Sequence, residues 1–121
     1  MKKILFIEDE SALQKTFGDL FSQSEYTMIS ALNGVAGIRL AETENPDLIL
    51  LDLILPKMHG LEVLKKLKSD PKTKHIPIII LTNLEEMDNI EKALSLGATT
   101  YLIKADYSLE EVLNKIKKIL K

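Results

Sequence analysis

The chain is 121 residues long and 45% hydrophobic, a size and composition that fit one globular domain, which we expect to span residues 1–121. Its 16 basic and 18 acidic residues leave a formal net charge of -2, and Arg39 is the one arginine, which argues against a nucleic-acid binder that relies on a basic surface. Cysteine is absent, which excludes disulfide bonds and thiolate metal sites.

The apolar runs of the sequence are no longer than β-strands, and Met1 to Lys3 lead directly into the first of them. A signal peptide and a membrane-spanning segment are therefore not expected. We expect a cytoplasmic protein that has neither a membrane nor a nucleic acid as a direct partner.

Five apolar runs are predicted as strands, in chain order at residues 3–8, 26–31, 47–52, 76–81 and 99–103. The third run contains Leu-Ile-Leu-Leu without polar alternation, which is typical of a strand buried on both faces. A segment with helical spacing follows each strand. This alternation predicts an α/β fold in which five helices cover the two faces of a five-stranded parallel sheet.

Each helical segment carries an apolar face. In chain order these faces contain Leu13, Phe17, Leu20 and Phe21; Val35, Ile38 and Ala41; Leu61, Leu64 and Leu67; Ile90, Ala93 and Leu94; and Leu109, Val112, Leu113, Ile116, Ile119 and Leu120. Asn83 with Glu86 predicts a weak cap for the fourth helix, and Gly97 predicts its end. Ser108 and Glu111 predict a capping box at the start of the fifth.

Acidic side chains follow two of the strands: Glu8 and Asp9 end the first, and Asp52 ends the third. Because the carboxyl ends of parallel strands meet at one edge of a sheet, these carboxylates are expected to lie together. Two like charges about 4 Å apart repel by on the order of 4 kcal/mol at an effective dielectric near 20. A divalent cation would remove this conflict, so the cluster predicts a metal site.

Thr82 and Lys104 follow the fourth and fifth strands and are expected at the same edge. Four strand ends would then bring carboxylates, a hydroxyl and an ammonium together. The alternative for any one acidic residue is that it turns into solvent or serves a helix start, as Glu10-Ser11 can do for the first helix.

Five motifs occur in a fixed order: Ile7-Glu8-Asp9-Glu10, residues 46–53, Leu55-Pro56 with Gly60, Leu81-Thr82, and Tyr101-Leu102-Ile103-Lys104. Over essentially its whole length the chain thereby resembles the receiver domain of two-component response regulators, and in particular the single-domain, chemotaxis-regulator-like members. The resemblance implies a flavodoxin-like, doubly wound sheet with strand order 2-1-3-4-5. In such sheets the site lies beyond the carboxyl ends of the strands, at the topological switch point.

The resemblance also implies roles for the strand-end residues. Asp52 would accept a phosphoryl group from a histidine kinase, a phosphotransfer protein or a small phosphodonor. Glu8, Asp9, Asp52 and the backbone carbonyl of Ile54 would hold Mg²⁺, Glu8 through a water molecule. Lys104 would contact one phosphoryl oxygen and Thr82 another. The protein would be no enzyme beyond its own self-phosphorylation and self-dephosphorylation.

Thr82 and Tyr101 match the residues with which family members switch. Thr82 would move toward the new phosphoryl group, and the face formed by the fourth helix, the fifth strand and the fifth helix would change for a downstream protein. Alternatively, Tyr101 is simply an amphipathic residue at a strand surface. No output domain follows Lys121, so a single-domain regulator is expected, and a fragment of a longer parent stays open.

Three positions depart from the family pattern. Glu8 stands where Asp is commoner, and Asn83 stands where a small residue is usual. Ala105 replaces the proline that usually follows the lysine. The cis form of a peptide bond without proline costs roughly 2.5 to 4 kcal/mol, so we predict a trans Lys104-Ala105 bond.

Ile54 and Leu84 are apolar at the two positions that flank the path of the attacking water in the family. The resemblance therefore implies slow hydrolysis of the phosphorylated form. Alternatively, Leu84 simply packs against the fourth helix and Ile54 against its loop. His59 and His75 have no ligand spacing and are predicted to be ordinary surface histidines.

Other functions remain open. A phosphorylation-independent interaction module of the same fold would have a vestigial acidic site, against which the complete set of strand-end residues counts. A flavin-binding electron carrier would need a Ser/Thr/Gly-rich phosphate loop, where this chain has Glu8 to Glu10. An aspartyl-phosphate phosphatase usually has a second aspartate two residues after its nucleophile, where this chain has Ile54.

Overall fold

Strands and helices alternate along the chain as the apolar pattern predicts. The computed structural model describes residues 1–121. Its elements are β1 (Lys2–Ile7), α1 (Ser11–Ser22), β2 (Tyr26–Ala31), α2 (Gly34–Glu44), β3 (Leu48–Leu51), α3 (Gly60–Ser69), β4 (Ile78–Thr82), α4 (Met87–Ser95), β5 (Thr100–Ile103), a 3₁₀ turn (Lys104–Asp106) and α5 (Leu109–Leu120).

The strands form one parallel sheet in the order β2-β1-β3-β4-β5, which confirms the flavodoxin-like arrangement. All carboxyl ends therefore point to the same edge. At the middle of the sheet, β1 pairs with β3 so that Ile7 lies beside Leu51. The residues that follow these two positions, Glu8 and Asp52, are thereby brought to neighbouring points on that edge.

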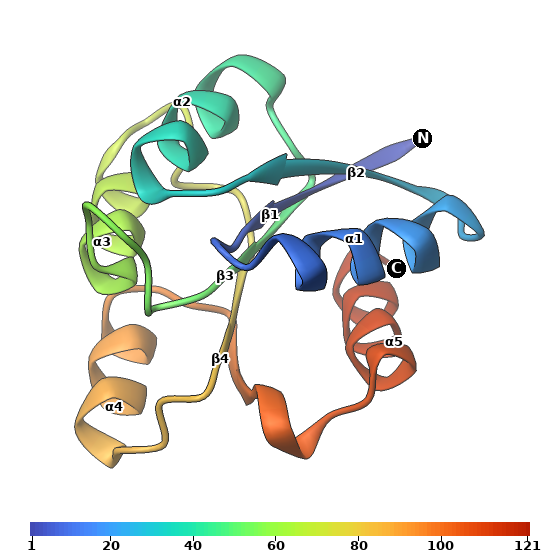
Figure 1. Cartoon of the computed structure of the whole chain (residues 1–121). Helices are drawn as coiled ribbons and strands as arrows, with labels where there is room; N and C mark the ends of the chain where they lie inside the picture. Colours follow the sequence, from blue (N-terminus) through green and yellow to red (C-terminus); the bar gives the residue numbers. More distant parts are fainter.

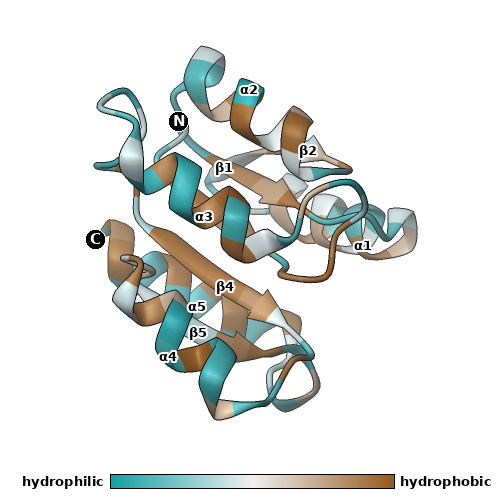
Figure 2. Ribbon diagram, turned by 90° about the vertical axis from the view of Figure 1, so that its left-hand side faces the viewer, coloured by the Kyte–Doolittle hydropathy of each residue, from teal (hydrophilic) through white to brown (hydrophobic).

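Two apolar layers hold the helices against the sheet. On one face, Ile4 and Phe6 of β1 pack with Phe17 of α1 and Ile116 of α5. The alternate residues of β1 pack on the other face with α2, α3 and α4. Figure 1 shows α1 and α5 on one side of the sheet and the other three helices opposite. In Figure 2, β4 and the C-terminal part of β1 are hydrophobic, whereas α3 and α4 alternate between hydrophilic and hydrophobic residues, as expected for helices with one face in solvent.

Several local features predicted from the sequence are present in the structure. The capping box of α5 is present: the Ser108 hydroxyl accepts from the Glu111 amide at 3.2 Å, and the Glu111 carboxylate accepts from the Ser108 amide at 2.8 Å. Gly97 follows α4 with a φ of 109°, a conformation that favours glycine. The Lys104-Ala105 bond is trans, as predicted, since the chain contains no cis peptide bond.

The predicted start of the fourth helix is wrong. Helix α4 begins at Met87 with Glu86 as its N-cap residue, and no side chain caps it. Asn83 lies four residues before Met87 in the β4–α4 loop, whose Leu84 carbonyl is bound by the Tyr101 hydroxyl. This tertiary contact favours a loop where the local pattern favours a cap.

Strand β4 is shifted relative to the prediction, because it begins at Ile78 and includes Thr82. Pro77 has no N–H to donate to a ladder, although its carbonyl accepts from the Ile49 amide at 3.0 Å.

None of the helices is long and apolar enough to cross a bilayer.

Candidate functional site

Three carboxylates meet at the carboxyl edge of the sheet. Glu8, Asp9 and Asp52 each offer one oxygen, and these atoms lie within 4.8 Å of one another. Glu8 and Asp52 are buried, with exposed fractions of 1% and 4%, whereas Asp9 is exposed. Backbone hydrogen bonds of the sheet hold Glu8 and Asp52 in place. The Glu8 amide donates to the Ala31 carbonyl at 3.0 Å, and the Asp52 amide donates to the Ile7 carbonyl at 3.1 Å.

Lys104 connects the two buried carboxylates. Its ammonium lies 2.6 Å from Glu8 Oε1 and 2.9 Å from Asp52 Oδ2. The repulsion among the carboxylates is therefore smaller than the acidic residues alone imply. With all three carboxylates ionised, one ammonium leaves two negative charges, which is the charge that a divalent cation balances.

Burial and ion pairing act in opposite directions on these groups. Burial raises the pKa of Glu8, although the hydrogen bonds from Lys104 and from the Glu10 amide act against it. For Lys104, burial by itself lowers the pKa, but the hydrogen bonds to Glu8 and Asp52 and their negative charges together outweigh it, so the pKa is raised. The ammonium is thus held in its charged form at the end of β5.

The second oxygen of Asp52 is held by the chain that follows it. The Ile54 amide donates to Asp52 Oδ1 at 3.2 Å, so both carboxylate oxygens have defined partners. Behind this loop, a Cβ on Gly60 would collide with the Asp52 carbonyl and with Leu53 Cα. Glycine is therefore required for the loop to close, and the Gly60 amide donates to the Leu53 carbonyl at 2.8 Å.

Thr82 presents a buried hydroxyl without a partner. Its side chain is fully buried at the end of β4, the strand next to β3, and its Oγ1 makes no hydrogen bond. A buried polar group without a partner costs about 1 to 3 kcal/mol. The hydroxyl is free to donate to an oxygen that enters this edge of the sheet.

Tyr101 ties β5 to the loop after Thr82. Its hydroxyl donates to the Leu84 carbonyl at 2.8 Å, and its ring packs against the layer that contains α2, α3 and α4. Burial raises the pKa of this hydroxyl. The residue is therefore more than a surface side chain, because it fixes the position of the β4–α4 loop.

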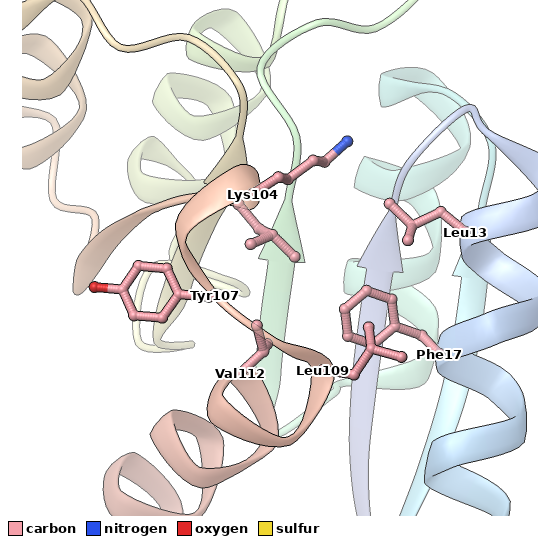
Figure 3. Close-up of a pocket in the computed structure, with 7 residues that line it drawn as sticks. Leu13, Phe17, Lys104, Tyr107, Leu109 and Val112 are labelled. Atoms are coloured by element: carbon pink, nitrogen blue, oxygen red, sulfur yellow. The ribbon is translucent and has the colours of Figure 1, made fainter.

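A small apolar cavity of about 70 Å³ lies beneath Lys104. It is lined by Leu13, Phe17, Leu81, Lys104, Tyr107, Leu109 and Val112. In Figure 3 the Lys104 side chain runs away from Tyr107, Leu109 and Val112. The apolar part of the Lys104 side chain thus lies beside the cavity, while its ammonium forms ion pairs with Glu8 and Asp52.

The donors present suit magnesium. Mg²⁺ takes oxygen ligands at about 2.0 to 2.1 Å, so three oxygens this close together need only small shifts to share one ion. The Thr82 hydroxyl, which has no hydrogen-bond partner, and the excess negative charge of the three carboxylates lie at the same carboxyl edge of the sheet.

Two polar residues near this edge have roles that the sequence pattern did not suggest. Gln14 is buried on α1, and its amide nitrogen donates to three backbone carbonyls. His59 is exposed, as predicted, but it is also the N-cap of α3, with its Nδ1 accepting from the Leu61 amide at 3.1 Å. The one sequence signal for the burial of Gln14 is its place on α1, next to the apolar Leu13 and one helical turn before Phe17.

Comparison with known proteins agrees with this geometry. The sequence model of the response regulator receiver domain matches residues 4–117. Sporulation initiation phosphotransferase F of Bacillus subtilis (strain 168) is 33% identical over 98% of this chain and 94% of its own length. Two similar transcriptional regulators are longer, and the chain spans 50% and 49% of them.

Solved structures give the same result. The Mn²⁺-bound form of response regulator Rcp1 superimposes with a TM-score of 0.82, at 32% identity over 98% of this chain and 91% of that one. A CheY-like receiver domain protein from Methanospirillum hungatei JF-1 reaches a TM-score of 0.92, at 28% identity over 99% and 94%. With the sheet order, the acidic cluster and a match over nearly its full length, this chain belongs to the receiver domain family of two-component response regulators.

Proposed function

We propose that this protein is a phosphorylation-dependent signalling switch in which Asp52 accepts a phosphoryl group from a histidine kinase or a phosphotransfer protein. Receiver domains are signalling proteins rather than classical enzymes. The observation that carries the proposal is the buried Asp52 carboxylate, which is held by Lys104 on one oxygen and by the Ile54 amide on the other.

In the transfer step, an Asp52 oxygen forms a bond to phosphorus while the phosphorus–nitrogen bond of the phosphohistidine breaks, and the imidazole nitrogen keeps the bonding electrons. Lys104 is already 2.9 Å from the carboxylate and can follow the negative charge onto a phosphoryl oxygen. The free hydroxyl of Thr82 donates to another. These residues act by position and by charge, which is how phosphoryl transfer is usually accelerated.

We propose that Glu8, Asp9, Asp52 and the Ile54 carbonyl hold Mg²⁺, whose chemistry is to neutralise charge on the phosphoryl oxygens. The oxygen cluster supports this assignment. The name of one similar structure states that it binds Mn²⁺, a cation that also prefers oxygen ligands.

The signal would leave the site through the β4–α4 loop. Thr82 and Leu84 are two residues apart, and the Leu84 carbonyl is bound by Tyr101. A shift of Thr82 toward a phosphoryl oxygen would therefore disturb the Tyr101 hydroxyl bond. We propose that this changes the face formed by α4, β5 and α5 for a downstream protein, without direct nucleic-acid binding. The expected cytoplasmic location stays a prediction.

The test is phosphorylation with acetyl phosphate or phosphoramidate in the presence of Mg²⁺, followed by intact-mass measurement. Wild type should gain one phosphoryl group, Asp52→Asn should gain none, and Asp88→Asn, a change on exposed α4, should behave as wild type. Equal labelling of wild type and Asp52→Asn would refute the assignment. No labelling of wild type by any small donor or histidine kinase would favour the phosphorylation-independent module.

A further inference from the structure

We infer that Gln14 is a positioning residue of the acidic site, and that its side-chain amide holds the turn that carries Glu8 and Asp9 in the geometry needed for metal binding. The inference deepens the proposed function and rests on it. Gln14 itself touches none of the carboxylates, so its effect would pass through the backbone.

Three backbone carbonyls, two from the end of β1 and the turn after it and one from the end of β2, converge on this amide. Gln14 Nε2 lies 2.9 Å from the carbonyl of Phe6, 3.1 Å from that of Glu8 and 3.1 Å from that of Ala31. Two N–H groups are thus shared among three acceptors. The contact joins the end of β1, the end of β2 and the turn before α1, and it adds to the ladder bond from the Glu8 amide to the Ala31 carbonyl.

The orientation of the amide is fixed by its surroundings. If the amide were flipped, its oxygen would face three carbonyl oxygens, which can only accept hydrogen bonds. In the observed orientation Gln14 Oε1 is buried without a partner, in a side chain that is 7% exposed. An apolar residue would fill this space without an unpaired oxygen, so what the amide adds is its pair of donors.

Gln14 also holds the same turn through its main chain. Its backbone amide donates to the Glu10 carbonyl at 3.1 Å, which starts α1, and the Glu10 amide donates to Glu8 Oε2 at 3.0 Å. The turn at residues 8–10 is therefore fastened at Glu8 by the Gln14 side chain and at Glu10 by the Gln14 backbone. A small movement of this turn would displace the Glu8 and Asp9 carboxylates relative to Asp52.

The experiment compares wild type with Gln14→Met, which keeps the length and neutral charge of the side chain but removes both donors. Phe21→Leu, on the buried face of the same helix, is the control for a general loss of stability. Binding of Mg²⁺ alone is followed by the NMR amide shifts of residues 8–10. Amide hydrogen exchange of the same residues is measured in the metal-free proteins.

We expect Gln14→Met to bind Mg²⁺ about 10-fold or more weakly, the range found when groups that orient metal ligands are removed. Exchange at residues 8–10 should be faster in this variant, and Phe21→Leu should change neither quantity. If wild type binds Mg²⁺ and Gln14→Met binds it equally well, the inference is wrong while the proposed function stands. If wild type does not bind Mg²⁺, both fail.

Discussion

Asp9 and Asp52 belong to one cluster, yet the structure gives their side chains different surroundings. Both oxygens of Asp52 are hydrogen-bonded, to Lys104 and to the Ile54 amide. Asp9 is exposed and contributes negative charge to the same site. From the sequence, loss of either charge is expected to relieve repulsion in the absence of metal. The structure restricts this expectation to Asp9, because removal of the Asp52 charge also weakens an ion pair.

We therefore expect Asp9→Asn to raise the free energy of unfolding without metal, by about 0.5 kcal/mol, as befits an exposed charge. Mg²⁺ should stabilise wild type more than this variant, because binding to the folded state adds stability that grows with the logarithm of the affinity. Thermal melting in EDTA and in Mg²⁺ measures both effects, with Asp52→Asn for comparison. A lower melting temperature of Asp9→Asn in EDTA would show that this carboxylate has a structural role.

At the scale of the elements, the start of α5 is capped by the Glu111 carboxylate, whose protonation can be followed by changing the pH. The Ser108 backbone amide, followed by the Ser108 side chain, lowers the pKa of Glu111 below its usual value. A carboxyl whose pKa is lower in the folded state binds fewer protons there than in the unfolded chain. Its contribution to stability is complete above the unfolded pKa and is lost as the pH falls through the folded one.

Glu111→Gln tests this cap, because glutamine can still accept from the Ser108 amide but carries no charge. The variant should melt below wild type at about pH 7, and the gap should close as the pH falls toward about 3. Melting curves across this range, with Glu110→Gln as the exposed neighbour, give the comparison. A gap that is independent of pH would mean that the charge does not contribute.

For the whole molecule, the lifetime of the signal depends on access of water to the phosphorylated site. The Ile54 side chain is 54% exposed, whereas Leu84 is partly buried against the α2–α4 layer. The family resemblance places both beside the path of the attacking water. Neither can orient a water molecule by hydrogen bonding, and both add bulk, so hydrolysis of phospho-Asp52 should be slow.

The expected result is that Ile54→Asn and Leu84→Glu each speed the decay of phosphorylated protein, and that the double variant decays several-fold faster than wild type. Decay is followed by intact mass after removal of the phosphodonor. Leu94→Glu, an apolar residue on α4 that is 47% exposed, controls for added charge. Unchanged decay in the double variant would show that these side chains do not gate the water.

Much of this architecture is encoded locally. Apolar runs without polar alternation are typical of central parallel strands, and residues 48–51 are indeed fully buried in β3. Ser108 and Glu111 are near neighbours in the chain, so their capping box is visible as a pattern. The edge at which Glu8, Asp9, Asp52 and Lys104 meet also follows from the sequence, because parallel strands must place their carboxyl ends together.

The remainder depends on contacts between segments that are distant in the chain. Only the packed structure shows that one Lys104 ammonium forms ion pairs with both Glu8 and Asp52, and that Asp9 stays exposed. The failed cap at Asn83 and the three carbonyls on Gln14 have the same origin. A local sequence pattern determines which backbone groups form hydrogen bonds within a helix or strand. The N–H and C=O groups at the ends of that element form hydrogen bonds with residues that the tertiary fold places beside them.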